Sequence, residues 1–110
     1  MRPDVRTHLE WIRLAIEEME QYAPLVGGFA AFKADRAKQL IVERCLIVIG
    51  EAVVRIGREA PELPLSEMKK IIMARNIIVH DYERVSIDIL FIIYDRHIPL
   101  LKSEVEALLK

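Results

Sequence analysis

Four polar residues stand close together near the end of an apolar stretch: Arg75, Asn76, His80 and Tyr82 all lie within "RNIIVHDY". A guanidinium can bind a phosphate through two parallel hydrogen bonds, and an imidazole can move protons near neutral pH. Together these are the minimum groups for cleaving a phosphodiester. If the stretch is helical, Asn76 and His80 share a face because they are four residues apart, and Arg75 lies to one side of them.

An ordinary structural role explains the same residues. Arg75 can cap helix carbonyls or pair with a carboxylate such as Glu51. His80 suits the C-terminal end of a helix, where a positive charge is favoured, and Tyr82 can simply pack. The spacing of the residues is compatible with both interpretations.

The other residues of chemical interest are interpreted as structural. Cys45 lies in the apolar run "CLIVIG" without a Cys/His pattern, so we expect a buried, unreactive thiol. His8 and His97 have no companions at metal-ligand spacing, and no metal site is expected. Trp11 could stack on a base, but we expect it to pack at the edge of its helix.

Basic residues gather on and just before the second long helical stretch: Lys33, Arg36, Lys38, Arg44, Arg55 and Arg58. They could guide RNA toward a cleft, although a solvated face is the default interpretation. The whole chain has 16 Lys and Arg against 17 Asp and Glu, a net charge of −1. This balance excludes a broad attraction for nucleic acid or anionic membranes, so any such contact must be local.

The length and composition favour one small soluble domain over residues 1–110, because 110 residues leave little room for a second core. Apolar residues make up 53% of the chain, more than a monomer of this size can easily hide, and so predict a partner interface. We recognise no signal-peptide core and no apolar run long enough to cross a bilayer. A cytoplasmic protein without membrane contact is expected.

Hydrophobic periodicity predicts helices throughout. The first begins near Pro3 and Asp4 and ends at "YAPLVGG", and it carries an apolar stripe. That stripe consists of Val5, Leu9, Ile12, Ile16 and Met19. The second helix is predicted from Phe29 to Arg58, where the chain lacks proline.

A third helix is predicted through "EMKKIIMARNIIVH", with Ser66 as its N-cap. The last helical stretch begins near Val85, and Pro99 divides it or opens a second segment. Short connections between long helices favour antiparallel neighbours. The predicted fold is therefore all-α, an antiparallel up-and-down bundle of four to five helices.

The last stretch has more apolar residues than one core can take. Two faces can be drawn: Val85, Ile89, Ile92 and Ile93, and Ile87, Leu90, Phe91 and Tyr94. A single bundle buries one of them, so a symmetric homodimer is expected to bury the other.

"RNIIVHDY" resembles the Arg-x-x-x-x-His-x-Tyr motif of the HEPN superfamily, in particular the HepT-like toxins encoded beside minimal nucleotidyltransferase antitoxins in type VII systems. The similarity covers nearly the whole chain, through "VIGEAVVRI", "PELPLSEMKK" and "IPLLKSEVEALL" in that order. The chain departs from the expected pattern at Leu65, where an aromatic residue is frequent, and at "ERVSID". Neither departure touches the motif.

The resemblance implies a HEPN-like bundle that dimerises with the two motifs facing each other and forms a metal-independent endoribonuclease site without a cofactor. Arg75 would bind the scissile phosphate, and His80 would act as general acid or base, leaving a 2′,3′-cyclic phosphate. Asn76 would orient the phosphate or the imidazole. Asp81 would help to hold His80 or Tyr82, with a solvated carboxylate as the alternative. The substrate would be RNA, with transfer RNA among the candidates.

The resemblance also implies that the antitoxin silences the toxin by adding AMP to Tyr82, beside Arg75 and His80, where its bulk and charge would repel an RNA phosphate. The cognate nucleotidyltransferase would then be a partner, in a complex that could be larger than the dimer. The alternative is a non-catalytic nucleotide- or partner-binding module that accompanies a nucleotidyltransferase. A dimeric helical scaffold without chemistry leaves "RNIIVHDY" unexplained.

Overall fold

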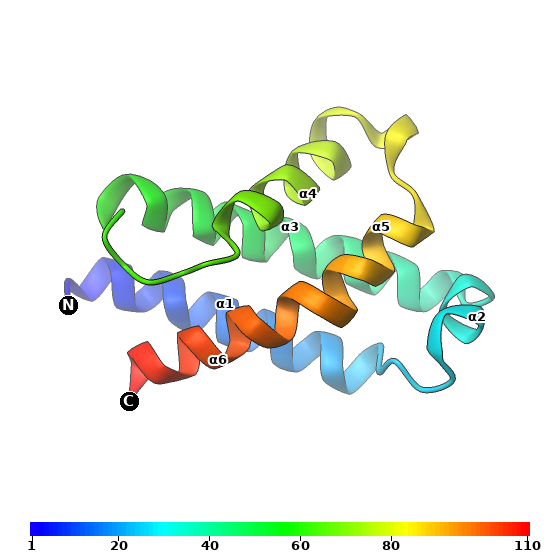
Figure 1. Ribbon diagram of the computed structural model, residues 1–110, viewed down its shortest axis with the longest axis horizontal. Coiled ribbons are helices and arrows are strands. Elements are labelled where there is room, and N and C mark those ends of the chain that lie inside the picture. Colours follow the sequence, from blue (N-terminus) through cyan, green and yellow to red (C-terminus); the bar gives the residue numbers. More distant parts are fainter.

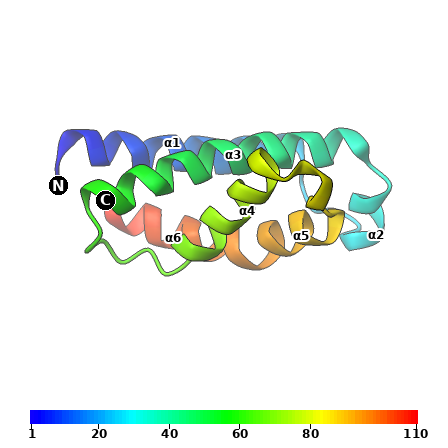
Figure 2. The ribbon, with the colours of Figure 1, turned by 90° about the horizontal axis from the view of Figure 1, so that it is seen from above.

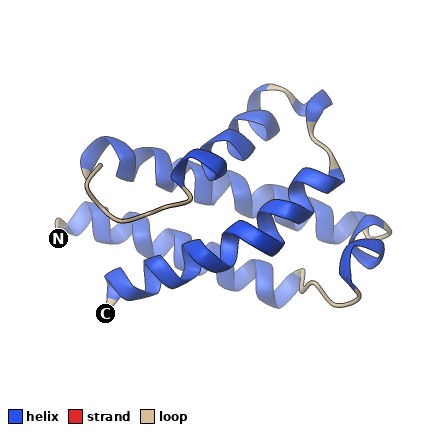
Figure 3. Cartoon of the chain, viewed as in Figure 1, coloured by secondary structure: helices blue, strands red, loops and turns tan.

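The computed structural model describes the backbone of residues 1–110 and every side chain except that of Tyr82. All regular elements in this range are helical (Figure 3). They are α1 (Pro3–Tyr22), α2 (Gly28–Lys33), α3 (Arg36–Glu59), α4 (Met68–His80), the short 3-10 segment η1 (Tyr82–Arg84), and then α5 (Ile87–Ile92), the π segment η2 (Ile93–His97) and α6 (Ile98–Leu109).

The last three elements follow one another without a break and form a single rod. Along the chain, α1, α3, α4 and this rod alternate in direction (Figure 1). Seen from above, α1 and α3 form one layer, and α4 and the rod form the other (Figure 2). The predicted antiparallel up-and-down bundle is confirmed.

The predicted stripe of α1 is the centre of the core. Val5, Leu9, Ile12, Ile16 and Met19 are each no more than 1% exposed. The helix begins at Pro3, as predicted, because proline has no N–H to leave unpaired in the first turn. Its apolar stripe packs mainly against α3.

The prediction of one helix from Phe29 to Arg58 is wrong, because the chain turns between α2 and α3. Asp35 is the N-cap of α3, and its carboxylate accepts a hydrogen bond from the Lys38 N–H at 3.1 Å. The buried Gln39 amide donates to the carbonyls of Phe32 and Lys33 at 2.9 and 3.0 Å. These bonds satisfy backbone groups that a helix end leaves open, so the break costs little.

The prediction that Ser66 caps α4 is also wrong. Its backbone N–H donates to the Glu104 carboxylate of α6, at 3.1 and 3.0 Å from the two oxygens. The N-cap residue is Glu67, whose side chain does not accept a hydrogen bond from the first turn of α4. Glu67 instead lies with its Oε2 2.9 Å from Nδ1 of His97. The start of α4 is therefore held by two polar links to the rod.

Pro99 opens α6, which confirms the prediction that it divides the last stretch. Its ring would clash with the carbonyl four residues earlier in a regular α-helix. The chain meets this constraint with the π segment directly before α6, where the wider turn makes room. Ser86 caps the start of the rod, because its hydroxyl accepts from the Ile89 N–H at 3.1 Å.

The division of this stretch into two alternative faces was wrong. The core takes Leu90 and Tyr94 from one predicted face and Ile93 from the other, whereas Ile92 is 41% exposed. Ile93 and Tyr94 lie three and four residues after Leu90, so the three share one helical face, which lies between the two predicted faces. The surplus apolar area is consequently smaller here than the sequence suggested.

Two weak acids are buried in the core between α1, α3 and the rod. Burial raises the pKa of the Cys45 thiol to about 11 and, with a smaller effect from Glu20, raises the pKa of Tyr94 to about 12. The Tyr94 hydroxyl donates to the Met19 carbonyl at 3.0 Å. The predicted buried thiol is confirmed. No helix in the described chain is long and apolar enough to span a bilayer.

These shifts predict a loss of stability in alkali. The ordinary pKa values of the two groups are 9.0 and 10.0, so below pH 9 both are neutral in the folded and the unfolded chain. Above that pH the unfolded chain ionises first, and the free energy of unfolding should fall progressively toward pH 12. Urea unfolding across this range measures the effect. In Cys45→Ala the fall should begin about one pH unit later, and identical curves for both proteins would contradict the assignment.

Candidate functional site

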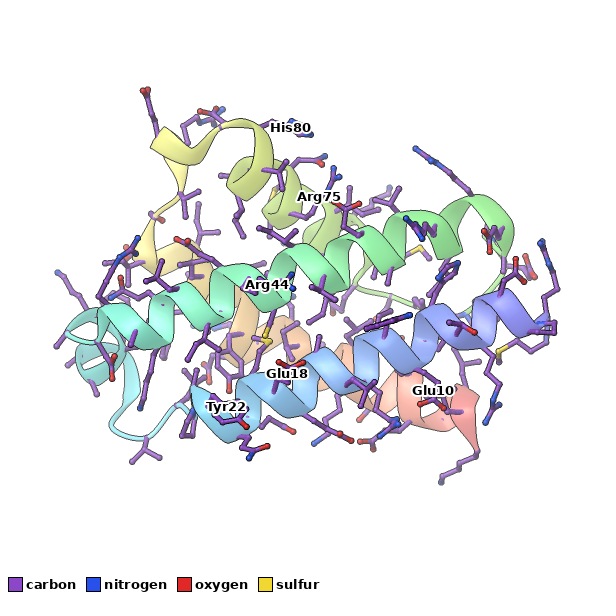
Figure 4. The ribbon with its side chains drawn as sticks, turned by 180° about the vertical axis from the view of Figure 1, so that it is seen from behind. Glu10, Glu18, Tyr22, Arg44, Arg75 and His80 are labelled. Atoms are coloured by element: carbon purple, nitrogen blue, oxygen red, sulfur yellow. The ribbon has the colours of Figure 1, made fainter. Side chains whose placement is uncertain are left out.

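Arg75 lies on the flank of α4 that faces α3 (Figure 4). Its Nη2 donates to Glu51 Oε1 and its Nη1 donates to Asn76 Oδ1, both at 2.8 Å. The Arg75 side chain is 19% exposed. The pairing with Glu51, foreseen as the structural alternative, is therefore present, and it holds the guanidinium in one place at the edge of the bundle.

Gly50 explains how an arginine fits here. A Cβ atom at this position would overlap the Cβ and Cγ atoms of Arg75. The missing side chain lets α3 and α4 approach closely, so that the arginine stem lies on the backbone of α3 and its head reaches Glu51, the next residue. We did not identify Gly50 from the sequence, although a glycine inside an apolar helical run is a signal for such an approach.

His80 is the last residue of α4 and is exposed. Asn76 shares its outward face, opposite the buried Ile71 and Ala74. No described side chain forms a hydrogen bond or an ion pair with His80. The predicted convergence is therefore partial: the structure joins Arg75 to Asn76, and it places His80 at the end of the same helix without a partner among the described side chains (Figure 4).

Asp81 follows as the C-cap residue, and its N–H donates to the Ile77 carbonyl at 3.0 Å. Its carboxylate accepts from Arg84 Nη1 at 3.3 Å, so the partner that the structure gives it is Arg84. Tyr82 opens η1 directly after it. The Tyr82 side chain lies outside the described part of the structure, and its expected role stays a prediction.

An open hollow of about 540 Å³ lies over the outward face of α4. Lys69, Asn76, Asp81 and Arg84 supply its polar lining, beside apolar residues that include Met73. Met73 is 48% exposed. The motif therefore borders a broad surface that is polar at one edge and apolar at the other, which suits an incoming macromolecule better than a small enclosed ligand.

The other two histidines each lie near a carboxylate. His97 pairs with Glu67, as described, and His8 Nε2 lies 3.3 Å from Glu59 Oε2. Within the described chain no group of three or more His, Cys, Asp and Glu side chains could hold a metal ion. Trp11 is 56% exposed, so it contributes less to packing than expected.

The chain is a small all-helical bundle that carries an arginine and a histidine along α4. The chain belongs to the HepT-like ribonuclease family, described as Ribonuclease HepT-like, whose profile matches residues 12–108. It is similar to the "Probable ribonuclease HepT" of Thermococcus cleftensis, with 32% identity over 114 residues that cover all of both chains. No solved structure matches the chain.

The contact at Gly50 predicts a large difference between two glycine substitutions on α3. Gly50→Ala should lower the free energy of unfolding by about 1–3 kcal/mol, because the overlapping atoms of Arg75 lie close to its backbone and cannot swing away. Gly57→Ala is the matched control, since a Cβ there meets only Met68 atoms, the nearest at 3.9 Å. It should raise stability by about 0.5–1 kcal/mol. Equal urea midpoints for the two variants would contradict the close approach.

Proposed function

We propose that the protein is a metal-independent endoribonuclease toxin of a toxin–antitoxin pair, with Arg75 binding the scissile phosphate and His80 moving the proton. The observation that carries the proposal is the fixed guanidinium of Arg75, with an exposed histidine five residues later on the same helix. Membership of the HepT-like ribonuclease family supports RNA as the substrate.

The Arg75 head keeps donors for a phosphate. A guanidinium has five N–H groups. One is used on Glu51, one on Asn76, and the Nε–H is buried without a partner. Two Nη N–H groups remain, on a side chain that is 19% exposed. A phosphate bound there would form charge-assisted hydrogen bonds to a head that is already oriented.

The proposed reaction is attack of the ribose 2′-hydroxyl on the adjacent phosphorus. A base takes the 2′-hydroxyl proton while the new O–P bond forms, and the bond from phosphorus to the 5′-oxygen breaks. An acid protonates that leaving oxygen, so the products are a 2′,3′-cyclic phosphate and a 5′-hydroxyl. Imidazole can perform either transfer, and the exposed His80 can approach a bound strand. Asn76 would keep the Arg75 head aimed at the phosphate.

A homodimer would supply both the acid and the base. Exposed apolar residues on α4 flank the motif, with Met73 48% and Val79 40% exposed. Burial of these residues between two copies would be favourable and would bring the two His80 side chains toward one strand of RNA. One imidazole could then act as base and the other as acid.

His80→Ala and Arg75→Ala should each reduce RNA cleavage by about 100-fold or more, because general acid–base catalysis and phosphate stabilisation both contribute on this scale. The assay uses purified protein and a broad RNA pool with a chelator present, and analyses the product ends. Arg58→Ala is the matched control, since Arg58 is exposed at the far end of α3. Its cleavage rate should equal that of the wild type.

Cleavage that survives in His80→Ala would contradict the assigned role of this residue, and ends other than cyclic phosphates would contradict the mechanism. Complete absence of cleavage by the folded wild type, with binding of nucleotide or nucleotidyltransferase retained, would favour a non-catalytic binding module.

We propose that the cognate nucleotidyltransferase silences the protein by adding AMP to the Tyr82 hydroxyl. The residue immediately follows Asp81 and lies two positions after His80, so its modification would place a phosphate beside the motif. An added negative charge would repel RNA from the site that Arg75 makes positive.

Tyr82→Phe separates this regulation from catalysis, because phenylalanine has no hydroxyl to modify. The wild type, incubated with the nucleotidyltransferase and ATP, should gain the mass of AMP and lose cleavage. Tyr82→Phe should keep its mass and its cleavage under the same conditions. Mass spectrometry and the cleavage assay measure both outcomes, and AMP addition to the variant would show that another residue is the acceptor.

A further inference from the structure

A second candidate binding surface lies along the line of contact between α1 and α3, called the seam here. The two helices run side by side on the face shown in Figure 4. A hollow of about 240 Å³ opens along this seam, and its lining includes Trp11, Arg44, Glu51 and Arg55. A smaller hollow of about 100 Å³ adjoins it and shares Trp11 and Arg44.

The α3 side of the larger hollow is a single stripe. Arg44, Val48, Glu51 and Arg55 follow one another at spacings of four, three and four residues, so they return to the same face of the helix. Glu51 stands in the middle of the stripe and binds Arg75. Glu51 therefore links this hollow to the guanidinium that is proposed to bind the scissile phosphate.

The two arginines of this stripe are available for a ligand. Both are exposed, and neither Arg44 nor Arg55 forms a hydrogen bond or an ion pair with a described group. They are eleven residues apart, about 16 Å along the helix, a distance that an extended strand of several nucleotides can cover. Glu51 is the sole carboxylate in the lining of the larger hollow, and its charge is already paired.

Trp11 forms the α1 side, where it lines both hollows with 56% of its surface exposed. A wide apolar ring left in water beside free guanidinium groups is the usual composition of a surface that binds single-stranded nucleic acid. Nearby, His8 faces Glu59 at 3.3 Å. Glu18 and Arg44 both line the smaller hollow. The negative charge of Glu18 would repel a phosphate there and so favour its binding in the larger hollow.

We propose that this hollow is a subsite for the single-stranded RNA that flanks the cleaved bond: Trp11 stacks on a base, and Arg44 and Arg55 bind backbone phosphates. The inference rests on the proposed ribonuclease function and adds to it the residues that hold the substrate beside Arg75. Base stacking tolerates every sequence, so this subsite would select single strands and not a particular base.

A second copy of the chain is a poorer occupant. The two arginines are unpaired, and a symmetric interface over this seam would bury four such charges, with one Glu51 per copy that already serves Arg75. A polyanionic strand instead brings a negative charge for each arginine.

The single tryptophan makes a direct test possible, because the chain contains no other indole. The probe is a mixed-sequence single-stranded 2′-O-methyl RNA, which can bind but has no 2′-hydroxyl for the cleavage reaction. Titration should quench the fluorescence of Trp11 saturably, and the affinity should fall with salt. Binding is measured in parallel by the anisotropy of a labelled copy of the same RNA.

Trp11→Ala should weaken RNA binding by about tenfold, and Trp11→Phe should recover part of that loss. Arg44→Gln and Arg55→Gln should each weaken binding and lower the slope of log affinity against log salt by about 0.7. Arg58→Gln is the matched control, because it removes an exposed arginine of α3 that does not line the hollow. It should bind as tightly as the wild type.

RNA binding without quenching, and with Trp11→Ala and the arginine variants unchanged, would overturn the subsite while leaving the proposed function intact. A dimer that dissociates in Trp11→Ala, as seen by light scattering, would assign the seam to a second copy and also overturn the subsite. No RNA binding and no cleavage by the folded wild type would overturn the proposed function itself.

Discussion

The close approach of α3 and α4 at Gly50 is the constraint on which the site depends. If residue 50 had a side chain, Arg75 would have to leave the helix interface, because the stem of Arg75 occupies the space that this side chain would take. With the glycine in place, the stem is buried and the head emerges beside Glu51. One absent side chain thus converts an arginine at a packed helix crossing into an oriented cation at the surface.

Partial burial of a charge is unfavourable unless hydrogen bonds compensate for the lost water. Arg75 meets this condition in part, with two acceptors on different residues, Glu51 of α3 and Asn76 of its own helix, while its buried Nε–H has no described partner. The half-exposed Glu51 can share the head with an incoming anion, which a fully buried carboxylate could not do. The contacts that pack Arg75 leave its side chain partly exposed, so the structural interpretation of the motif is compatible with the proposed function.

Much of the fold follows from the sequence because it depends on local rules. The α1 stripe shows the helical period, Pro3 and Pro99 mark helix starts, and all were predicted correctly. The errors lie where residues far apart in the sequence determine the local structure. The Ser66 N–H is taken by Glu104, 38 residues away.

For the site, residue types suggested the chemistry, and the Arg75–Glu51 pair was foreseen. The role of Gly50 and the seam beside Trp11 depend on how α3 packs against α4 and α1, which spacing within one helix does not reveal. The buried face of the last rod belongs to the same group, because the packing of the rod against the other helices determines which of its apolar residues enter the core.

The anchoring of α4 has a geometric consequence. Its first turn is tied to the rod through Glu67 and His97, and Ser66 just before it is tied to Glu104. Its other end rises away from the rod (Figure 1). The helix resembles a lever held at one end: a small rotation about the fixed end moves His80 farther than Arg75, five residues nearer the anchor. His80 is therefore the less constrained of the two residues, because Arg75 is also tied to Glu51 of α3.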